Sequence, residues 1–413
     1  MKKMIMEKVE HSLQAPNPLF DALKYIKSQS PIVNNDFIED YQFAKQFLYT
    51  YRDSEATFNA YRREVERLLQ WSSLIAKKSI KELRRSDIEA YFEFCQSPPL
   101  AWIGTKKAPR FIDKNGERLP NPEWRPFVAT VTKVAHRKGK KPNPHKYELS
   151  QNALQEIFAI LSSFYNFLIQ EEYTEVNPIL YIRQKNKYFR KRQGKPKIRR
   201  LTDLQWFYVI ETAELMAKHD KKHERTLFIM NALYAMYLRI SELAASKHWK
   251  PKMGDFHRDH DGLWWFTTVG KGNKERDISV SDKMLESLKR YRHYLKLSSL
   301  PPPSDKTPLL TRTKGKGPII STTYIRRIVQ KCFDEAVQRL QTEGFQEEAE
   351  GLLEATVHWL RHTGISDDVK HRPREHVRDD AGHGSSSITD KYIDVELRAR
   401  PASGKKKAIK PDI

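Results

Sequence analysis

The sequence predicts a mainly helical protein with a small β-sheet, divided into two domains. Long apolar stripes recur in both halves at the spacing of amphipathic helices. Two short segments, 262–268 and 277–280, have the composition of strands and flank a Gly- and Lys-rich turn at 270–276. A basic stretch at 183–200 without any acidic residue separates the halves. Together these features predict an α+β protein in which helices dominate.

Composition favours a polyanionic partner. The 413 residues suffice for two or three domains, and 74 Lys and Arg against 52 Asp and Glu give a formal net charge of +22. A folded chain with that charge is typical of nucleic-acid binding. No apolar run is long enough to span a membrane, and the first 13 residues lack the apolar core of a signal peptide. Cys95 and Cys332 lie in helical patterns, so we expect buried reduced thiols and a cytoplasmic protein.

The N-terminal half begins with a weakly patterned segment. Residues 1–35 contain three prolines, so we expect an N-terminal arm, with order beginning near Asp36 and a helical domain at 36–182. Ser54 is the predicted N-cap of a helix whose apolar positions are interleaved with arginines. These arginines are candidates for DNA binding, with a solvated helix face as an equal alternative: Arg62, Arg63 and Arg67.

Further along this domain the helical pattern stops and returns. Ser86 and Glu89 predict a capping box that opens a helix at Asp87. Residues 97–148 contain many prolines, a turn signal at 113–117 and a basic run at 137–141, which indicates either a large loop or a small β-insert. From 150 to 172 a broad apolar stripe predicts the helix that completes the domain core.

The basic stretch at 183–200 is the predicted interdomain linker. Its charges repel one another in water, so we expect it to lie along a phosphate backbone, where counterion release favours binding. A solvated linker is the alternative. The candidate DNA contacts are Lys187, Arg190, Lys191, Arg192 and Lys195. Thr202 with Gln205 predicts a capping box that opens the second domain, 201–399, and a basic tail follows at 400–413.

One arginine stands out in the second domain. Residues 227–245 are apolar almost all round, as in a buried helix, yet Arg239 lies among them. A guanidinium in apolar surroundings must be paired or directed at a ligand. Pairing with Glu242 three residues later is the structural alternative. Farther along, Ser321 is the predicted cap of another helix.

The C-terminal part gathers chemical groups that suit phosphoryl transfer. His358, Arg361, His383 and Tyr392 lie within one short stretch. A guanidinium matches two phosphate oxygens, an imidazole transfers protons near neutral pH, and a tyrosine can attack phosphorus. His358 and His362 resemble half of a zinc motif, but position 359 is Trp where H-E-x-x-H requires Glu, so we expect no metal.

Five separated motifs then resemble the tyrosine recombinases of the λ-integrase type. They are L-R-I-S-E-L at 238–243, G-K-G-N-K-E-R at 270–276, H-W-L-R-H-T at 358–363, A-G-H at 381–383, and Tyr392. They occur in the family's order, with the family's spacing from His383 to the tyrosine. The resemblance implies a catalytic domain at 201–399 and a helical core-binding domain at 36–182, which together form a C-shaped clamp on DNA.

The resemblance also implies a role for each residue. Arg239 and Arg361 grip the scissile phosphate, His383 donates to it, and His358 accepts a proton or orients the nucleophile. Tyr392 attacks and forms a 3′-phosphotyrosine intermediate. Lys271 protonates the departing 5′ oxygen, with Lys274 as the alternative, and Glu242 is a supporting residue. Lys274 is also a candidate for DNA binding. No metal or other cofactor is required.

The resulting hypothesis is a site-specific DNA recombinase, either an integrase or a transposition enzyme of a mobile element. Its expected partners are double-stranded DNA with recombination sites, further copies of the chain in a synaptic tetramer, and accessory DNA-bending or directionality proteins. A non-catalytic DNA-binding regulator and a type IB topoisomerase-like enzyme are the alternatives. The segment 367–380 is more polar than the family pattern, so we expect it to contact DNA or a neighbouring protomer.

Overall fold

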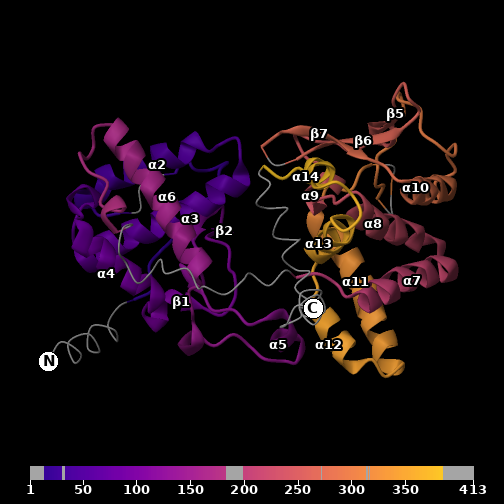
Figure 1. The fold of residues 1–413 in the computed structure, drawn as a ribbon. Coiled ribbons are helices and arrows are strands. Elements are labelled where there is room, and N and C mark those ends of the chain that lie inside the picture. Colours follow the sequence, from indigo (N-terminus) through magenta and orange to yellow (C-terminus); the bar gives the residue numbers. More distant parts are fainter. Residues whose placement is uncertain are drawn as a thin grey trace, which may run out of the picture. The chain divides into compact units, whose positions relative to one another are not determined.

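The computed structural model describes residues 14–29, 33–182, 199–270, 272–312, 315 and 317–384. The chain divides into two compact units, 1–194 and 195–413, each with its own apolar core (Figure 1). The boundary falls inside the predicted basic linker. Both units are mainly helical and carry short strands, as predicted.

The first unit is built on four longer helices. They are α2 (Ile38–Thr50), α3 (Glu55–Trp71), α4 (Arg85–Gln96) and α6 (Gln151–Gln170), with the short α5 (Lys133–Arg137) between the last two. Helix α3 packs against α2 and α6. Ser54 caps α3 by accepting a hydrogen bond from the Thr57 amide, as predicted. The predicted stripe on α6 is buried in the core, including Leu161, Phe164 and Leu168.

The predicted start of α4 is wrong by two residues. The helix begins at Arg85, so Ser86 lies inside its first turn. Asp87 accepts a hydrogen bond from the Arg84 amide at 2.8 Å. This carboxylate satisfies a donor that the helix itself leaves unpaired, so the chain turns into the helix before Ser86.

Residues ahead of Asp36 belong to the core of the first unit. Leu19, Phe20 and Ile26 are buried, although the sequence pattern places the start of order near Asp36. The amides of Leu19 and Phe20 donate to the Glu66 carboxylate at 2.7 and 3.1 Å. The expectation fails because this segment is held by a buried side chain from α3, which local periodicity cannot reveal.

The segment 97–148 is a β-containing insert, the second of the two predicted alternatives. Strand β2 (Phe111–Lys114) pairs antiparallel with β3 (Glu117–Pro120), and the turn between them uses Asn115 and Gly116 at φ 53° and 82°. Positive φ at both central positions suits an Asn-Gly turn. Strands β1 (Ile103–Gly104) and β4 (Phe127–Val128) pair in parallel. Trp102 and Phe127 are fully buried, so the insert contributes to the domain core.

The second unit combines eight α-helices with a three-stranded sheet in its described residues. The helices are α7 (Asp203–His219), α8 (Glu224–Ala235), α9 (Ile240–Leu243), α10 (Asp282–Tyr294), α11 (Thr322–Thr342), α12 (Gln346–Leu353), α13 (Val357–Asp368) and α14 (Arg374–Ala381). Strands β5 (Phe256–Arg258), β6 (Trp264–Val269) and β7 (Glu275–Ser279) form an antiparallel sheet in that order. The hairpin of β6 and β7 was predicted, whereas the short β5 was not.

Local caps in this unit agree with the sequence. The Thr202 hydroxyl accepts from the Gln205 amide at 3.1 Å, and the Gln205 side chain accepts from the Thr202 amide at 3.0 Å. Ser321 caps α11 through the Tyr324 amide. Cys95 and Cys332 are buried free thiols, as predicted. Among the residues that the structure describes, no helix is long and apolar enough to cross a membrane.

The predicted single helix over 227–245 is wrong. Helix α8 ends at Ala235, Tyr237 takes a left-handed conformation at φ 49°, and α9 begins at Ile240. Gly364 of α13 packs directly against the Tyr234 carbonyl, where a Cβ atom would clash. The Tyr237 carbonyl accepts a hydrogen bond from Arg361. The break between α8 and α9 therefore lies where this segment contacts α13, and it places Arg239 outside the apolar core.

Candidate active site

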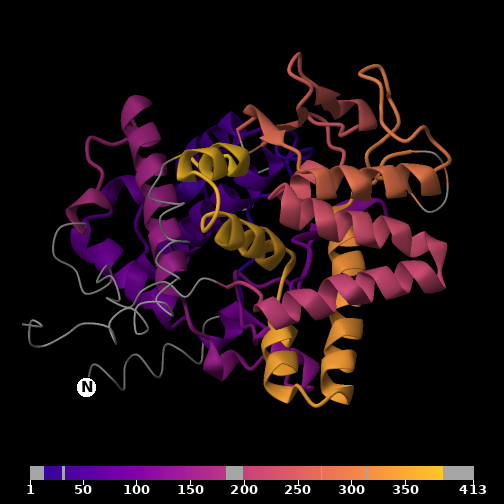
Figure 2. The same ribbon diagram turned by 45° about the vertical axis from the view of Figure 1, so that its right-hand side comes forward.

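Three separate elements bring the described candidate residues together. Arg239 stands at the start of α9, His358 and Arg361 lie on α13, and His383 follows α14. Helix α13 packs against α8 and α14, and α14 packs against β7. Figure 2 shows α13 and α14 as the two yellow helices that follow one another along the chain. The site is thus assembled from segments up to about 140 residues apart in sequence.

Arg361 is buried and held by backbone carbonyls. Its residue surface is only 4% exposed. One guanidinium nitrogen donates to the Tyr237 carbonyl, and the other terminal nitrogen donates to the Ala381 carbonyl. A planar guanidinium fixed at two points has little rotational freedom. Arg361 therefore presents its charge in a defined orientation.

Arg239 is oriented by Glu242 and by the turn before His383. Its Nη1 lies 3.1 Å from Glu242 Oε1, and its Nη2 donates to the Gly382 carbonyl at 3.3 Å. The side chain keeps 29% of its surface exposed. The pairing of Arg239 with Glu242, which the sequence offered as the structural alternative to a ligand-binding role, is therefore observed. The same ion pair leaves the guanidinium accessible to a ligand.

The two arginines converge on the residues just before His383. Arg361 binds the carbonyl of Ala381 and Arg239 binds that of Gly382. Gly382 ends α14 in a left-handed conformation at φ 61°, which suits glycine. The His383 amide then donates to the Arg378 carbonyl at 3.1 Å. Two cations and one imidazole are consequently held by one short turn.

Desolvation, followed by the nearby positive charges, lowers the pKa values of the histidines at this site. Desolvation, followed by the charges of Arg361 and Arg239, lowers the pKa of His383 from 6.5 to about 4. Desolvation, His358 and Arg361 lower the pKa of His362 to about 4. The pKa of His358 is also lowered, by desolvation and then by Arg361, Arg326 and Arg239. A bound phosphate would oppose these effects and favour the imidazolium forms.

The depressed pKa of His362 predicts acid sensitivity of the second unit. The unfolded state, with a pKa near 6.5, binds more protons than the folded state, with a pKa near 4. The free energy of unfolding therefore falls as the pH falls through this window. We expect the melting temperature to drop between pH 7 and pH 5, and to drop less in His362→Asn. Thermal melts of both proteins across this range test the prediction. The difference in melting temperature at pH 8 measures the effect of the substitution on packing. An equal dependence of the melting temperature on pH for both proteins would contradict the prediction.

Glu242 is a buried carboxylate shared by two arginines. Its side chain is 1% exposed and binds Arg276 through both oxygens, at 2.8 and 3.0 Å. Burial alone would raise the pKa of Glu242, but hydrogen bonds and charge from Arg276, then from Arg239, leave it below its ordinary value. Glu242 therefore stays ionised beside Arg239, and its supporting role in catalysis stays a prediction.

Sequence reasoning missed Arg276, although it ends a quoted motif. Its alternation along β7 places it on the same face as Ile278, which is fully buried. An arginine at a core-facing strand position was the available signal. Arg326 on α11 was also missed; it contributes to the lowered pKa of His358 and lies on the exposed side of its helix.

The polar segment 367–380 forms an internal network. The Tyr237 hydroxyl donates to Asp368, and Arg372 donates to Asp380 at 2.6 Å. Asp380 also accepts from the hydroxyl of Ser279 on β7 at 2.6 Å. Asp368, Arg372 and Asp380 are thus paired within the unit, and the contact of this segment with DNA or a neighbouring protomer stays a prediction.

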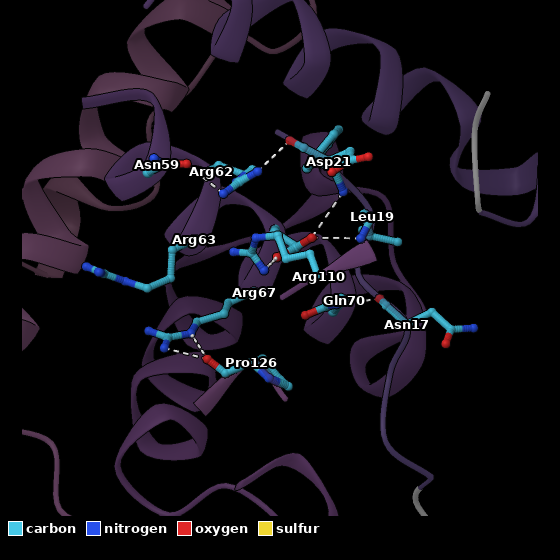
Figure 3. A network of polar contacts seen from close by, with 12 residues as sticks. Asn17, Leu19, Asp21, Asn59, Arg62, Arg63, Arg67, Gln70, Arg110 and Pro126 are labelled. Carbon is cyan, nitrogen blue, oxygen red and sulfur yellow. Dashed lines mark hydrogen bonds and ion pairs between the residues drawn. The ribbon is translucent and has the colours of Figure 1, made fainter. Parts of the chain in front are cut away.

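The arginines of α3 differ in their surroundings (Figure 3). Arg67 is buried and donates to the Pro126 carbonyl and to Glu64. Arg62 donates to the Asp21 carbonyl and to Asn59. Arg63 pairs with Glu64 and Glu156 and keeps 42% of its side chain exposed. The structure thus places Arg67 inside the fold, whereas Arg62 and Arg63 are partly exposed.

Several predicted residues lie outside the described part of the chain. They are Lys271, Tyr392 and the linker candidates Lys187, Arg190, Lys191, Arg192 and Lys195. Lys274 is described and exposed on the β6–β7 hairpin, where its carbonyl accepts from the Gly270 amide at 2.8 Å. Among the described residues, no group of three or more His, Cys, Asp or Glu side chains is arranged to hold a metal ion.

Comparison with known proteins identifies the family. Residues 205–398 match the phage integrase family. The chain is 26% identical to tyrosine recombinase XerC of Thermodesulfovibrio yellowstonii over 256 residues, which covers 60% of this chain and 73% of the relative. It is 30% identical to tyrosine recombinase XerD of Rickettsia bellii over 148 residues, covering 35% and 45%.

A solved structure shares the fold. The XerH site-specific recombinase bound to a palindromic difH substrate, in a post-cleavage complex, aligns with a TM-score of 0.53 and 14% identity, covering 93% of this chain and 94% of the other. Residues 205–398, which lie in the second unit, match the phage integrase family, and the relatives that the chain resembles are tyrosine recombinases. The chain is a site-specific recombinase, an enzyme that cleaves and transfers DNA strands.

Proposed function

We propose that the turn after α14, α9 and α13 form the phosphate-binding part of the recombinase active site. The observation that carries this proposal is the attachment of Arg361 and Arg239 to the consecutive carbonyls of Ala381 and Gly382. Attack on phosphorus gathers negative charge on the equatorial oxygens. Cations that are already oriented stabilise this charge without reorganisation, and such donors contribute large catalytic effects.

Tyr392 is the proposed nucleophile. Its phenolic oxygen forms a bond to phosphorus while the bond to the 5′ oxygen of the next nucleotide breaks. The products are a 3′-phosphotyrosine and a 5′ hydroxyl, so the energy of the phosphodiester is kept for rejoining. A free tyrosine has a pKa near 10, so its proton must leave during the attack. His358 is the proposed acceptor or orienting group for that proton.

The proton required by the departing oxygen has a separate proposed donor. Lys271 stands next to Gly270 in the hairpin sequence and is the first candidate, with Lys274 as the alternative. A lysine beside several arginines gives up its proton more readily than a free one. His383 contributes a hydrogen bond to the phosphate, because an anion raises the depressed pKa of its imidazole.

The proposed partners extend from DNA to further copies of the chain. The acid-free linker lysines and arginines, together with Arg63, are the candidates for contacts with the phosphate backbone. Two DNA sites brought together require four active sites, so a tetramer on DNA is the proposed working form. Accessory DNA-bending proteins belong to the same proposal. Two buried free cysteines agree with action in a reducing cytoplasm.

The experiment that tests this proposal traps the intermediate. A DNA duplex from the regions flanking the gene is nicked so that the cleaved strand diffuses away and cannot be rejoined. Wild-type protein is expected to give a covalent protein–DNA band on a denaturing gel, and Tyr392→Phe is expected to give none while still binding the DNA. A band of equal strength from the variant would show that another residue attacks.

An intact duplex of the same sequence separates recombination from topoisomerase-like activity. Two differently labelled duplexes are mixed with the protein, and the exchange of labels between them is followed. A recombinase joins a strand of one duplex to the other, whereas a type IB topoisomerase-like enzyme reseals only the original strand. We expect exchanged products. Tight binding without any covalent band would instead favour a DNA-binding regulator.

A further inference from the structure

Arg276 lies at the centre of the described part of the active site. It is not one of the residues that are expected to bind the phosphate. It lies on β7 with 12% of its side chain exposed. All three guanidinium nitrogens have partners: Nη1 and Nη2 bind the two Glu242 oxygens at 2.8 and 3.0 Å, and Nε donates to the Asp380 carbonyl at 3.0 Å. One side chain therefore links β7, α9 and the end of α14.

Two glycines bring further backbone against the same guanidinium. A Cβ atom at Gly270 would lie 2.9 Å from Arg276 Nη1 and 3.3 Å from Glu242 Oε1. A Cβ atom at Gly382, which has φ 61°, would lie 2.9 Å from Arg276 Cδ. Gly270 immediately precedes Lys271, and Gly382 immediately precedes His383. The hairpin base and the histidine turn thus pack on opposite parts of one arginine.

A second clamp fixes the end of α14 to the same strand. The Asp380 carboxylate accepts from the Ser279 amide at 3.2 Å and from the Ser279 hydroxyl at 2.6 Å. Arg372 donates to both Asp380 and Ser279, at 2.6 and 2.9 Å. Asp380 is only 5% exposed. These contacts already attach the end of α14 to β7. The contacts of Arg276 therefore determine the exact position of the turn before His383.

We propose that Arg276 is a positioning residue that aligns three catalytic groups at once. It holds Arg239 through their shared partner Glu242, the His383 turn through Asp380 and Gly382, and the lysine hairpin through Gly270. This inference rests on the proposed roles of Arg239, His383 and the hairpin lysine. Because strand β7 carries Arg276 only a few residues after the hairpin, a shift of the hairpin moves the His383 turn with it.

The three contacts made by the side chain at position 276 require a guanidinium. A planar fork can bind both oxygens of one carboxylate and a carbonyl at the same time, whereas an ammonium is a single point charge. Lysine at position 276 would keep the charge next to Glu242 but lose at least one of the three contacts. Charge and alignment can therefore be separated by comparing the variants Arg276→Lys and Arg276→Gln.

The test measures single-turnover cleavage of the nicked duplex and binding of the same DNA. Arg276→Lys and Arg276→Gln are expected to slow cleavage by about 10²-fold, the usual effect of a misplacement of roughly 1 Å, with DNA affinity nearly unchanged. The matched controls are Arg258→Lys and Arg258→Gln. Arg258 lies on β5 of the same sheet and donates to the Gly262 carbonyl at 2.7 Å, so its loss should leave cleavage at the wild-type rate.

A modified substrate reports on alignment rather than on folding. When sulfur replaces the 5′ bridging oxygen, the leaving group is a thiolate, which departs without a proton because thiols have a pKa near 8.5. The hairpin lysine then becomes dispensable. We expect this substrate to restore part of the cleavage rate of Arg276→Lys and Arg276→Gln but none of that of Tyr392→Phe.

The outcomes are distinguishable. Cleavage by both Arg276 variants at the rate of the Arg258 controls would overturn the inference, and so would a defect that the sulfur substrate leaves unchanged. If Arg276→Gln melts well below wild type, its slow cleavage could reflect unfolding. The result for Arg276→Lys then decides the test, because this variant keeps the positive charge beside Glu242. A wild-type protein that forms no covalent band would overturn the proposed function instead.

Discussion

Arg361→Lys is expected to slow formation of the covalent complex by roughly 10²–10³-fold, the loss typical of removing one donor to a developing oxyanion. The reason is geometric as much as electrostatic. The guanidinium is buried, and its two terminal nitrogens hold the carbonyls of Tyr237 and Ala381. A lysine keeps the charge, but it cannot bridge both carbonyls and offer a donor to the phosphate.

Single-turnover cleavage of the nicked duplex measures the effect. Arg258→Lys is the matched control, because Arg258 is exposed on β5 and donates to the Gly262 carbonyl. Both proteins should bind the duplex with similar affinity, since one buried arginine makes a small share of the total phosphate contacts. If Arg361→Lys cleaved within a factor of about three of the control, the assignment of Arg361 to the phosphate would fail.

Glu66→Gln is expected to destabilise the first unit by about 3–5 kcal/mol, the range for breaking a buried ion pair. The Glu66 side chain is fully buried, lies 2.7 Å from Arg110 Nη1, and accepts the amides of Leu19 and Phe20. Figure 3 shows Leu19 and Arg110 of this network. Without the carboxylate charge, Arg110 of the insert is left buried and unpaired.

Denaturant unfolding and amide hydrogen exchange test this prediction together. The exchange of the Leu19 and Phe20 amides should accelerate in Glu66→Gln, because their acceptor is weakened. Glu156→Gln is the control, since Glu156 forms an exposed ion pair with Arg63 and such pairs contribute at most about 1 kcal/mol. Equal unfolding midpoints for the two variants would contradict the account of the buried network.

Local features of the fold were readable from the sequence. The caps at Ser54, Thr202 and Ser321 depend on contacts within three residues, and all three are confirmed. The β6–β7 hairpin was also predicted, since its strands and turn are contiguous. The fold class followed from these local signals, because helical periodicity and a hairpin are determined by residues that are close in sequence.

Features created by distant contacts were not predictable in the same way. The break between α8 and α9 depends on Gly364 and Arg361, more than a hundred residues later in the chain. The burial of Leu19 and Phe20 depends on Glu66. Arg67 matched the pattern of an exposed basic helix face, but the insert covers it.

The candidate site shows the same division. Arg239, Glu242, His358, Arg361 and His383 were recognisable because each stands in a short motif with a chemical rationale. The structure adds what no motif gives, namely that Arg239 and Arg361 hold consecutive carbonyls before His383. Arg276 escaped attention because its partners come from α9 and α14, which the sequence does not place beside β7.

The most direct test of the account is the identity of the residue that carries the DNA. The covalent complex formed on the nicked duplex is digested with nuclease and trypsin, and the peptide that retains a nucleotide is sequenced by mass spectrometry. The account predicts a 3′-linked nucleotide on the peptide that contains Tyr392. A nucleotide attached to any other residue, or joined through its 5′ end, would contradict it.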